Sequence, residues 1–200
     1  MFKKLLSFAK KKEVKETFIT IQLNDKIMPL DRGEHYEEPI EEYLEKHNYG
    51  EVSGGGTMQG QSGEIQFCDI EVLLYNKNDK PKVIGELINM LEHLGAPKGS
   101  RVITADSEET IAFGRKEGLA IYLDGINLPE PVYAECDSNF VLEELSKLVG
   151  YDGEVQRYWQ GDTETALYFY GDSFENMKTA ISEFISTYPL CQNARVVQIA

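Results

Sequence analysis

The sequence has no long apolar run, and it holds few cysteines. No stretch approaches the roughly 18 continuous apolar residues of a membrane-spanning helix. The three cysteines are an odd number without close pair spacing, which fits reduced thiols in the cytoplasm. The short apolar run at the N-terminus is followed by lysines and not by a small-residue cleavage site, which argues against a secretion signal. These absences predict a cytoplasmic protein without a transmembrane segment.

Basic residues are scarce outside the N-terminus. The chain holds 20 Lys and Arg against 34 Asp and Glu, a net charge of −14. Residues 1–12 contain five of the lysines and no acid, which leaves 15 basic against 34 acidic groups in residues 13–200. So acidic a body repels phosphate backbones, and we expect no nucleic-acid partner. It suits a protein partner with a basic surface, although acidity for solubility alone explains it equally well.

Groups for nucleophilic catalysis are also sparse. Such catalysis needs a Ser or Cys beside a base that a third group holds in place. All three histidines, His35, His47 and His93, fall in the first half of the chain. Cys136 and Cys191 fall in the second half, so a Cys–His pair there would have to cross the molecule. We therefore expect no catalytic residues.

Possible metal ligands lie on one predicted helix. Glu37, Glu41 and Glu45 are four residues apart and share a helical face, with His35 and His47 nearby. No Glu-x-x-His or His-x-x-x-His pair accompanies them, so a solvated acidic face is the simpler interpretation. We expect no metal site and no cofactor.

A glycine-rich run suggests a phosphate-binding loop but does not complete one. Residues 55–60 spell G-x-x-x-x-G, yet the lysine that should follow is missing. The residues after the run alternate as a strand does, so no helix N-terminus is offered to a phosphate. An edge strand or bulge explains the glycines better.

The chain does contain an internal repeat. Residues 21–25 (IQLND) are echoed 100 positions later by residues 121–125 (IYLDG), and Arg101-Val102 by Arg195-Val196, 94 positions later. Ordered landmarks with drifting offsets are typical of two copies of one module after insertions and deletions. The repeat predicts two lobes of about 90–100 residues each.

Each predicted lobe has the element order β-α-β-β-α-β, with antiparallel sheets. In the first, apolar alternation and helical spacing predict strands over 18–23, 51–58, 65–75 and 101–105, and helices from Pro39 to Gly50 and over 82–94. In the second, they predict strands near 119–124, 154–159, 164–170 and 194–199, and helices over 139–149 and 173–188, with Asp172 as N-cap. This order resembles the ferredoxin-like split βαβ unit. The predicted fold is α+β, with two tandem ferredoxin-like units.

The predicted organisation has four parts. A basic N-terminal tail covers residues 1–16, and its first twelve residues could make weak contact with a membrane surface. The first ferredoxin-like unit covers 17–106 and the second covers 119–200. A connector of helix or loop over 107–118 joins them.

Two carboxylates on one strand form the first candidate binding group. Asp69 and Glu71 share a strand face, opposite Cys68, Ile70 and Val72. In a split βαβ unit the helices cover one face of the sheet and leave the other open. The two carboxylates could therefore act there as an acid–base pair or a cation site, or could simply be solvated.

Aromatic residues form the second candidate group. Tyr168 and Tyr170 alternate on one predicted strand, and Tyr158 and Trp159 lie on the neighbouring strand. Aromatics on such a sheet can stack nucleic-acid bases, but only Arg157 supplies positive charge nearby. They are equally the residues of protein interfaces, or could be buried where the open faces of the lobes pack together.

These features favour a non-catalytic, acidic binding or regulatory protein. One specific form is an immunity-type inhibitor, whose acidic groups complement the basic cleft of a toxic nuclease. A protein partner or self-association is expected. The alternative is a small-molecule sensor or enzyme that uses the cleft between the lobes, where ligand sites are common.

Overall fold

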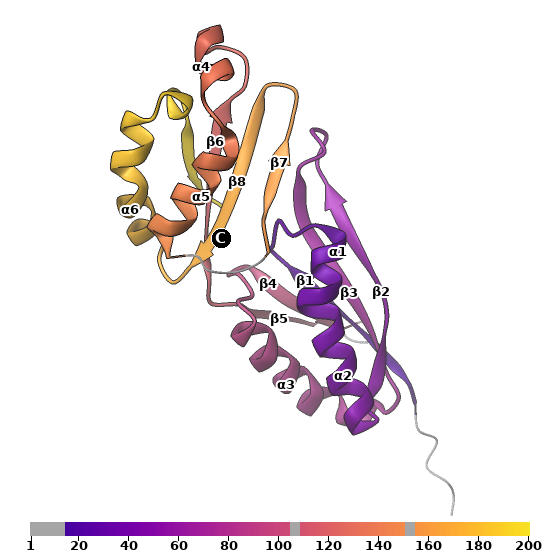
Figure 1. Ribbon diagram of the computed structural model, residues 1–200. Coiled ribbons are helices and arrows are strands. Elements are labelled where there is room, and N and C mark those ends of the chain that lie inside the picture. Colours follow the sequence, from indigo (N-terminus) through magenta and orange to yellow (C-terminus); the bar gives the residue numbers. More distant parts are fainter. Residues whose placement is uncertain (1–14, 105–108, 151–154) are drawn as a thin grey trace, which may run out of the picture.

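A computed structural model of the chain describes residues 15–104, 109–150 and 155–200. It contains two antiparallel sheets, each with helices packed on one face (Figure 1). We refer to the described residues up to 116 as the first half and to those from 117 as the second half. The predicted α+β class with antiparallel sheets is confirmed.

The sheet of the first half has the order β2-β3-β1-β4-β5. Every neighbouring pair is antiparallel, and Ile21 at the centre lies opposite Ile70 and Val102. Alternation along β1 places Ile19, Ile21 and Leu23 on the helix-covered face. The strands are β1 (Thr17–Leu23), β2 (Gly50–Gln59), β3 (Ile65–Leu74), β4 (Ser100–Thr104) and β5 (Thr110–Phe113).

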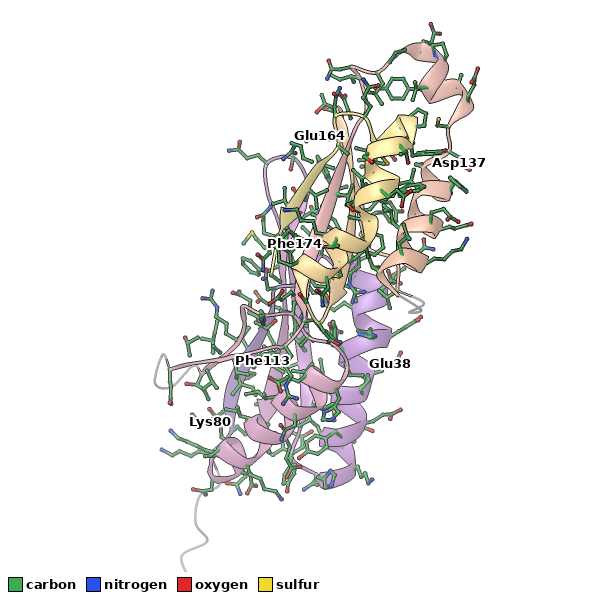
Figure 2. The ribbon with its side chains drawn as sticks, turned by 90° about the vertical axis from the view of Figure 1, so that its left-hand side faces the viewer. Glu38, Lys80, Phe113, Asp137, Glu164 and Phe174 are labelled. Carbon is green, nitrogen blue, oxygen red and sulfur yellow. The ribbon has the colours of Figure 1, made fainter. Side chains whose placement is uncertain are left out.

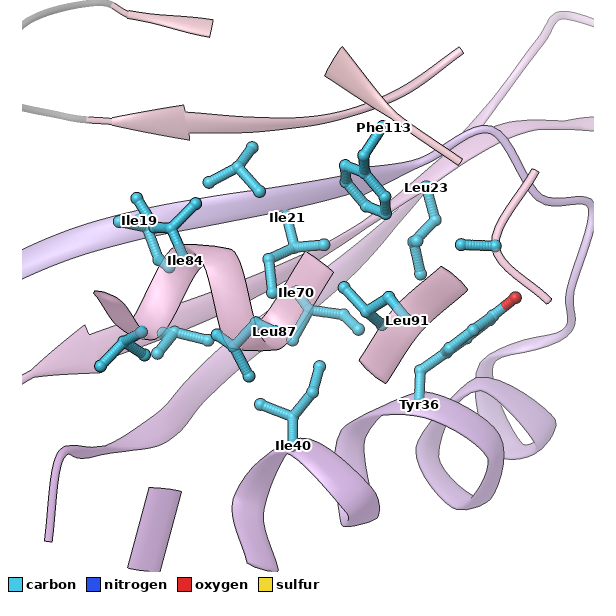
Figure 3. Close-up of a cluster of buried hydrophobic side chains, with 14 of the residues drawn as sticks. Ile19, Ile21, Leu23, Tyr36, Ile40, Ile70, Ile84, Leu87, Leu91 and Phe113 are labelled. Carbon is cyan, nitrogen blue, oxygen red and sulfur yellow. The ribbon is translucent and has the colours of Figure 1, made fainter. Parts of the chain in front are cut away.

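The helices of the first half lie together on one side of this sheet (Figure 1). Ile40 of the first long helix and Leu87 and Leu91 of the second meet the sheet in a fully buried core (Figure 3). The elements are α1 (Pro29–Arg32), a π-helix (Gly33–Glu37), α2 (Glu38–His47), a 3₁₀ turn (Lys77–Asp79) and α3 (Lys80–His93).

The sheet of the second half has the order β7-β8-β6-β9. Val141 and Leu145 of one long helix and Ile181 of the other are buried against it. The elements are β6 (Glu117–Asp124), α4 (Glu130–Glu135), α5 (Ser138–Val149), β7 (Tyr158–Gln160), β8 (Glu164–Gly171), α6 (Phe174–Thr187), a 3₁₀ turn (Pro189–Cys191) and β9 (Arg195–Gln198).

Several local predictions need correction. The predicted connector of helix or loop contains strand β5, which pairs with β4 and extends the first sheet. The N-cap of α6 is Ser173 and not Asp172, because the Ser173 hydroxyl accepts the hydrogen bond of the Asn176 N–H. The π-helix and α4 were not predicted. Residues 1–14 of the predicted tail and residue 154, where the strand predicted over 154–159 would begin, fall outside the described residues. The observed strand β7 begins only at Tyr158.

The glycine-rich run belongs to β2, an edge strand with a bulge after Val52, as predicted. Gly55 lets the buried Arg32 side chain approach the strand closely. A Cβ on Gly55 would lie 2.9 Å from both Arg32 Nη2 and the Asp69 carbonyl oxygen. Arg32 Nη1 donates to the Gly56 carbonyl at 2.7 Å and to Thr57 Oγ1 at 3.0 Å. The run therefore serves the packing of an arginine.

The two halves meet where the β2–β3 turn packs on the open face of the second sheet. Tyr122 and Tyr168 both donate hydrogen bonds of 2.8 Å to one carboxylate oxygen of Glu64. Trp159 Nε1 donates to the Ser62 carbonyl at 3.2 Å. Because these contacts join residues far apart in sequence, they fix the second half against the first.

Candidate functional site

A cleft of about 870 Å³ lies between the two halves. Its wall from the first half comes from α1, the π-helix and the end of α3, and its wall from the second half comes from the ends of α5 and β8. Phe113 of the first half and Phe174 of the second half lie on either side of the boundary between the halves (Figure 2). The lining residues that matter for chemistry are Asp31, Glu34, His35, Lys116, Arg157, Tyr170 and Asp172.

The π-helix presents His35 to the cleft. One extra residue per turn distinguishes a π-helix from an α-helix, and such segments are frequent at functional sites. His35 Nε2 lies 2.9 Å from the carbonyl oxygen of Leu94, at the end of α3. A carbonyl only accepts, so Nε2 carries the proton and Nδ1 of the neutral ring is left as a hydrogen-bond acceptor.

The surroundings of His35 favour its neutral form. Partial burial lowers the pKa of this imidazole from 6.5, and the nearby Arg157 guanidinium lowers it further. The hydrogen bond to Leu94 and the Asp25 carboxylate act in the opposite direction without reversing the shift. At pH 7 His35 is therefore uncharged and able to accept a proton or a hydrogen bond.

A buried ion pair supports the floor of the cleft. Arg157 Nε lies 2.7 Å from Asp25 Oδ1, and Arg157 Nη2 lies 3.0 Å from Asp25 Oδ2. Tyr36, next to His35, donates its hydroxyl proton to Asp25 Oδ2 at 2.9 Å. All three side chains are buried, with Asp25 fully enclosed. This network ties the π-helix of the first half to the segment just before β7 in the second half.

Tyr170 and Lys116 complete the wall. The Tyr170 hydroxyl accepts from the backbone N–H of Lys26 at 3.0 Å, and the Arg157 guanidinium lies 5.3 Å from the centre of its ring. Burial raises the pKa of Tyr170 well above 10, so this phenol stays protonated. Lys116 Nζ lies 2.6 Å from Asp172 Oδ1 across the rim.

The predicted carboxylate group lies away from this cleft. Asp69 and Glu71 share the open face of the first sheet, as alternation requires. Asp69 accepts a hydrogen bond of 2.9 Å from Gln22 Nε2. The side-chain oxygen of Gln22 accepts a second hydrogen bond from Arg101 Nε. The residues opposite them on β2 are Gly54 and Gly56, which carry no side chains.

The predicted aromatic group is divided by the sheet. Trp159, Tyr168 and Tyr170 lie together on the open face of the second sheet, and Tyr170 also reaches the cleft. Tyr158 is exposed and lies opposite Leu167, whose side chain points to the helix-covered face. Burial and the Glu64 carboxylate raise the pKa of Tyr168, so its hydroxyl is kept as a donor.

The candidate metal ligands on the first long helix are separated. Glu37 pairs with Arg32, and Glu41 accepts the backbone N–H of Val52. Within the part of the chain that the structure describes, His, Cys, Asp and Glu side chains nowhere gather in threes that could hold a metal ion. None of the helices formed by residues 15–104, 109–150 and 155–200 has the length and apolar character needed to cross a membrane.

Sequence reasoning missed the central pair of the site. Asp25 ends the repeated segment 21–25, and its carboxylate gives no sequence signal that distinguishes it from other surface acids. In the sequence Arg157 stands out only as an isolated base beside the aromatic residues. Their partnership joins positions 132 residues apart. Only the packing of the two halves brings them together.

Comparison with known proteins gives distant structural matches only. No family model and no curated protein matches the chain. It is similar to the crystal structure of a candidate monooxygenase from Lactobacillus acidophilus NCFM, with 13% identity, a TM-score of 0.31 and coverage of 92% of this chain and 94% of that one.

Two further structures match at the same level. An unknown protein from Galdieria sulphuraria has 12% identity, a TM-score of 0.29 and coverage of 93% and 98% of the two chains. A mutant chlorite dismutase from Candidatus Nitrospira defluvii has 12% identity, a TM-score of 0.28 and coverage of 92% and 89%.

The expectation of a non-catalytic acidic binding protein, with an immunity-type inhibitor as its specific form, is wrong. The cleft lies between the halves, where the alternative expectation placed a small-molecule site. The sensor or enzyme alternative fits the position of this cleft better.

Proposed function

We propose that the chain binds a polar small molecule in the cleft between its halves, as a sensor or an enzyme. The observation that carries this proposal is the neutral His35 imidazole in the wall of an 870 Å³ cleft. This volume lies within the roughly 300–1,000 Å³ of ordinary ligand sites. A buried ion pair between Asp25 and Arg157 supports the site from below.

The arrangement suits both ligand binding and proton transfer. Because Leu94 holds the Nε2 proton, the other ring nitrogen of His35 can accept from a ligand without a change of tautomer. Asp25, Arg157 and Tyr36 hold the walls in a fixed relation, so little ordering is needed when a ligand arrives. In an enzyme His35 would serve as the general base.

We also propose that the two halves are ferredoxin-like units, covering residues 17–106 and 119–200, that arose by duplication. Both sheets place the second, third, first and fourth strands of their half in the same order, and β5 is an addition at one edge. The cleft is then a product of the duplication, because it needs both units. The free cysteines support a cytoplasmic location.

A thermal-shift screen with metabolites and metal ions tests the proposed function. A ligand that binds only the folded state raises the melting temperature in proportion to the logarithm of its concentration. We expect a hit whose shift is lost in His35→Phe and in the milder His35→Gln. His47→Phe is the matched control, since His47 is exposed at the end of α2, outside the cleft, and its Nδ1 hydrogen-bonds the Tyr43 carbonyl one turn earlier.

Two results would count against the function. One is a complete screen without a hit. The other is a hit whose shift is the same in His35→Gln, His35→Phe and His47→Phe, because such a ligand binds outside the cleft.

A further inference from the structure

The cations in the wall of the cleft already have carboxylate partners. Lys116 Nζ pairs with Asp172 at 2.6 Å, and Arg157 holds Asp25 in a two-point contact. An anionic ligand would have to displace one of these carboxylates, and Asp25 is fully buried. Among its described residues, the wall therefore has no cationic side chain available to bind an anionic ligand without the loss of one of these ion pairs.

Two carboxylates of the wall, Asp31 and Glu34, have no cationic partner among the described residues. Asp31 and Glu34 stand three residues apart, beside His35, at the start of the helix formed by α1, the π-helix and α2. Neither carboxylate side chain has a hydrogen bond or an ion pair to any residue in the described ranges. His35 adds an acceptor and no charge. This side of the cleft is thus rich in acceptors and net negative.

The C-terminal ends of two helices add to the negative potential, against the partial positive charge of the helix N-terminus beside Asp31 and Glu34. The C-terminal ends of α3 and α5 reach the wall through Leu94 and Gly150. Unpaired carbonyl groups give a helix C-terminus a partial negative charge, equivalent to about half an elementary charge. The N-terminus of α6 lies next to the wall, but Ser173 and Glu117 already accept its backbone N–H groups.

We propose that the ligand of the cleft is a small organic cation that carries one or more protonated amines. This inference rests on the proposed function and names the ligand class for the same site. Amine groups would donate to Asp31, Glu34 and His35. The apolar side chains of Leu94, Val149 and Val155 in the same wall suit the methylene groups of such a molecule better than a hydrated inorganic ion.

Isothermal titration calorimetry with two probes of equal length tests the ligand class. The probes are 1,5-diaminopentane, a dication at pH 7, and glutarate, a dianion. We expect the diamine to bind and glutarate not to bind. In the double variant Asp31→Asn/Glu34→Gln the diamine should bind roughly tenfold more weakly, as expected for the loss of two partly exposed ion pairs.

The matched control is Glu38→Gln/Glu42→Gln. It removes the same charge from exposed positions on α2, outside the wall of the cleft. Diamine affinity in this control should stay within about twofold of the wild type, because exposed charges at a distance are screened by salt. Loss of binding confined to the cleft variant supports the inference.

Three results would overturn the inference. The diamine fails to bind, it binds equally to both double variants, or glutarate binds as tightly as the diamine does. If, in any of these cases, a library compound still shows His35-dependent binding, the proposed function stands and only the ligand class is wrong.

Discussion

Arg157 of the second half donates two hydrogen bonds, of 2.7 and 3.0 Å, to the carboxylate of Asp25 in the first half, and both side chains are buried. A buried ion pair of this kind seldom adds much net stability, because both ions lose their hydration. Loss of one partner is costly, however, since the other charge remains enclosed. The pair therefore fixes how the halves fit together.

Replacement of Arg157 by Gln should destabilise the fold strongly. Asp25 would remain buried without a counter-charge, which costs about 3–5 kcal/mol. Urea unfolding measured by circular dichroism gives the difference in the free energy of unfolding. The control is Arg115→Gln, which breaks an ion pair of 2.7 Å with Glu92 whose arginine is 67% exposed. That variant should lose less than about 1 kcal/mol, and equal losses in both would contradict this role for Asp25 and Arg157.

Tyr36→Phe should cost about 1–3 kcal/mol, because Asp25 loses a buried hydroxyl donor while the ring keeps its place in the core. Tyr75→Phe removes a comparable hydroxyl bond, 2.9 Å from Glu51, at an exposed position. There water replaces the lost partner, so we expect almost no change in the free energy of unfolding. Thermal or urea denaturation of both variants side by side separates the two cases. A neutral Tyr36→Phe would mean that the Asp25 network is not closed to solvent.

Gly55 and Gly56 are adjacent glycines, and we expect substitution by alanine to destabilise the protein at Gly55 but not at Gly56. Gly55→Ala places a methyl group 2.9 Å from Arg32 Nη2 and from the backbone oxygen of Asp69, which should cost about 1–3 kcal/mol. Gly56→Ala meets nothing within 4 Å and should change stability by less than about 0.5 kcal/mol. Chemical denaturation of the two variants measures the contrast. A tolerated Gly55→Ala would show that Arg32 does not need the close approach.

The pKa of His35 makes stability depend on pH below neutrality. Its folded-state pKa is lowered from 6.5, so the unfolded chain takes up this proton at a higher pH than the folded protein. The contribution of the neutral ring is present above pH 6.5 and is lost as the pH falls towards the lowered value. His35→Phe should flatten this part of the stability profile, whereas His47→Phe should keep it. NMR titration of the His35 ring should give a midpoint below 6.5, and a midpoint at or above 6.5 would contradict the assignment.

Local pattern predicted most of the strands and long helices correctly. Alternation along 18–23 and 65–75 and helical spacing over 82–94 carried strong signals, because these segments pack one face against a core. Strand β5 was missed because four residues beside a glycine turn give too short a pattern. The π-helix was missed because its extra residue breaks the helical period at Gly33–Glu37.

The site was harder to predict than the fold. Its wall combines His35, Lys116, Arg157 and Asp172, which belong to separate segments and meet only through the packing of the halves. The predicted pair Asp69 and Glu71 stands on a shared sheet face, as alternation requires, but that face lies outside the cleft. Of the predicted binding residues, Tyr170 alone lines the cleft. A sequence shows which residues share a face, and it does not show which faces meet.

Chemical-shift mapping by NMR shows directly whether a ligand binds between the two halves. The ¹⁵N-labelled wild-type protein is titrated with the strongest compound from the thermal screen. We expect shift changes concentrated at Gly95, Lys116 and Gly171 in the cleft, and their loss in His35→Gln. Changes centred instead on Gly56 and Asp69, at the open face of the first sheet, would contradict a ligand site between the halves.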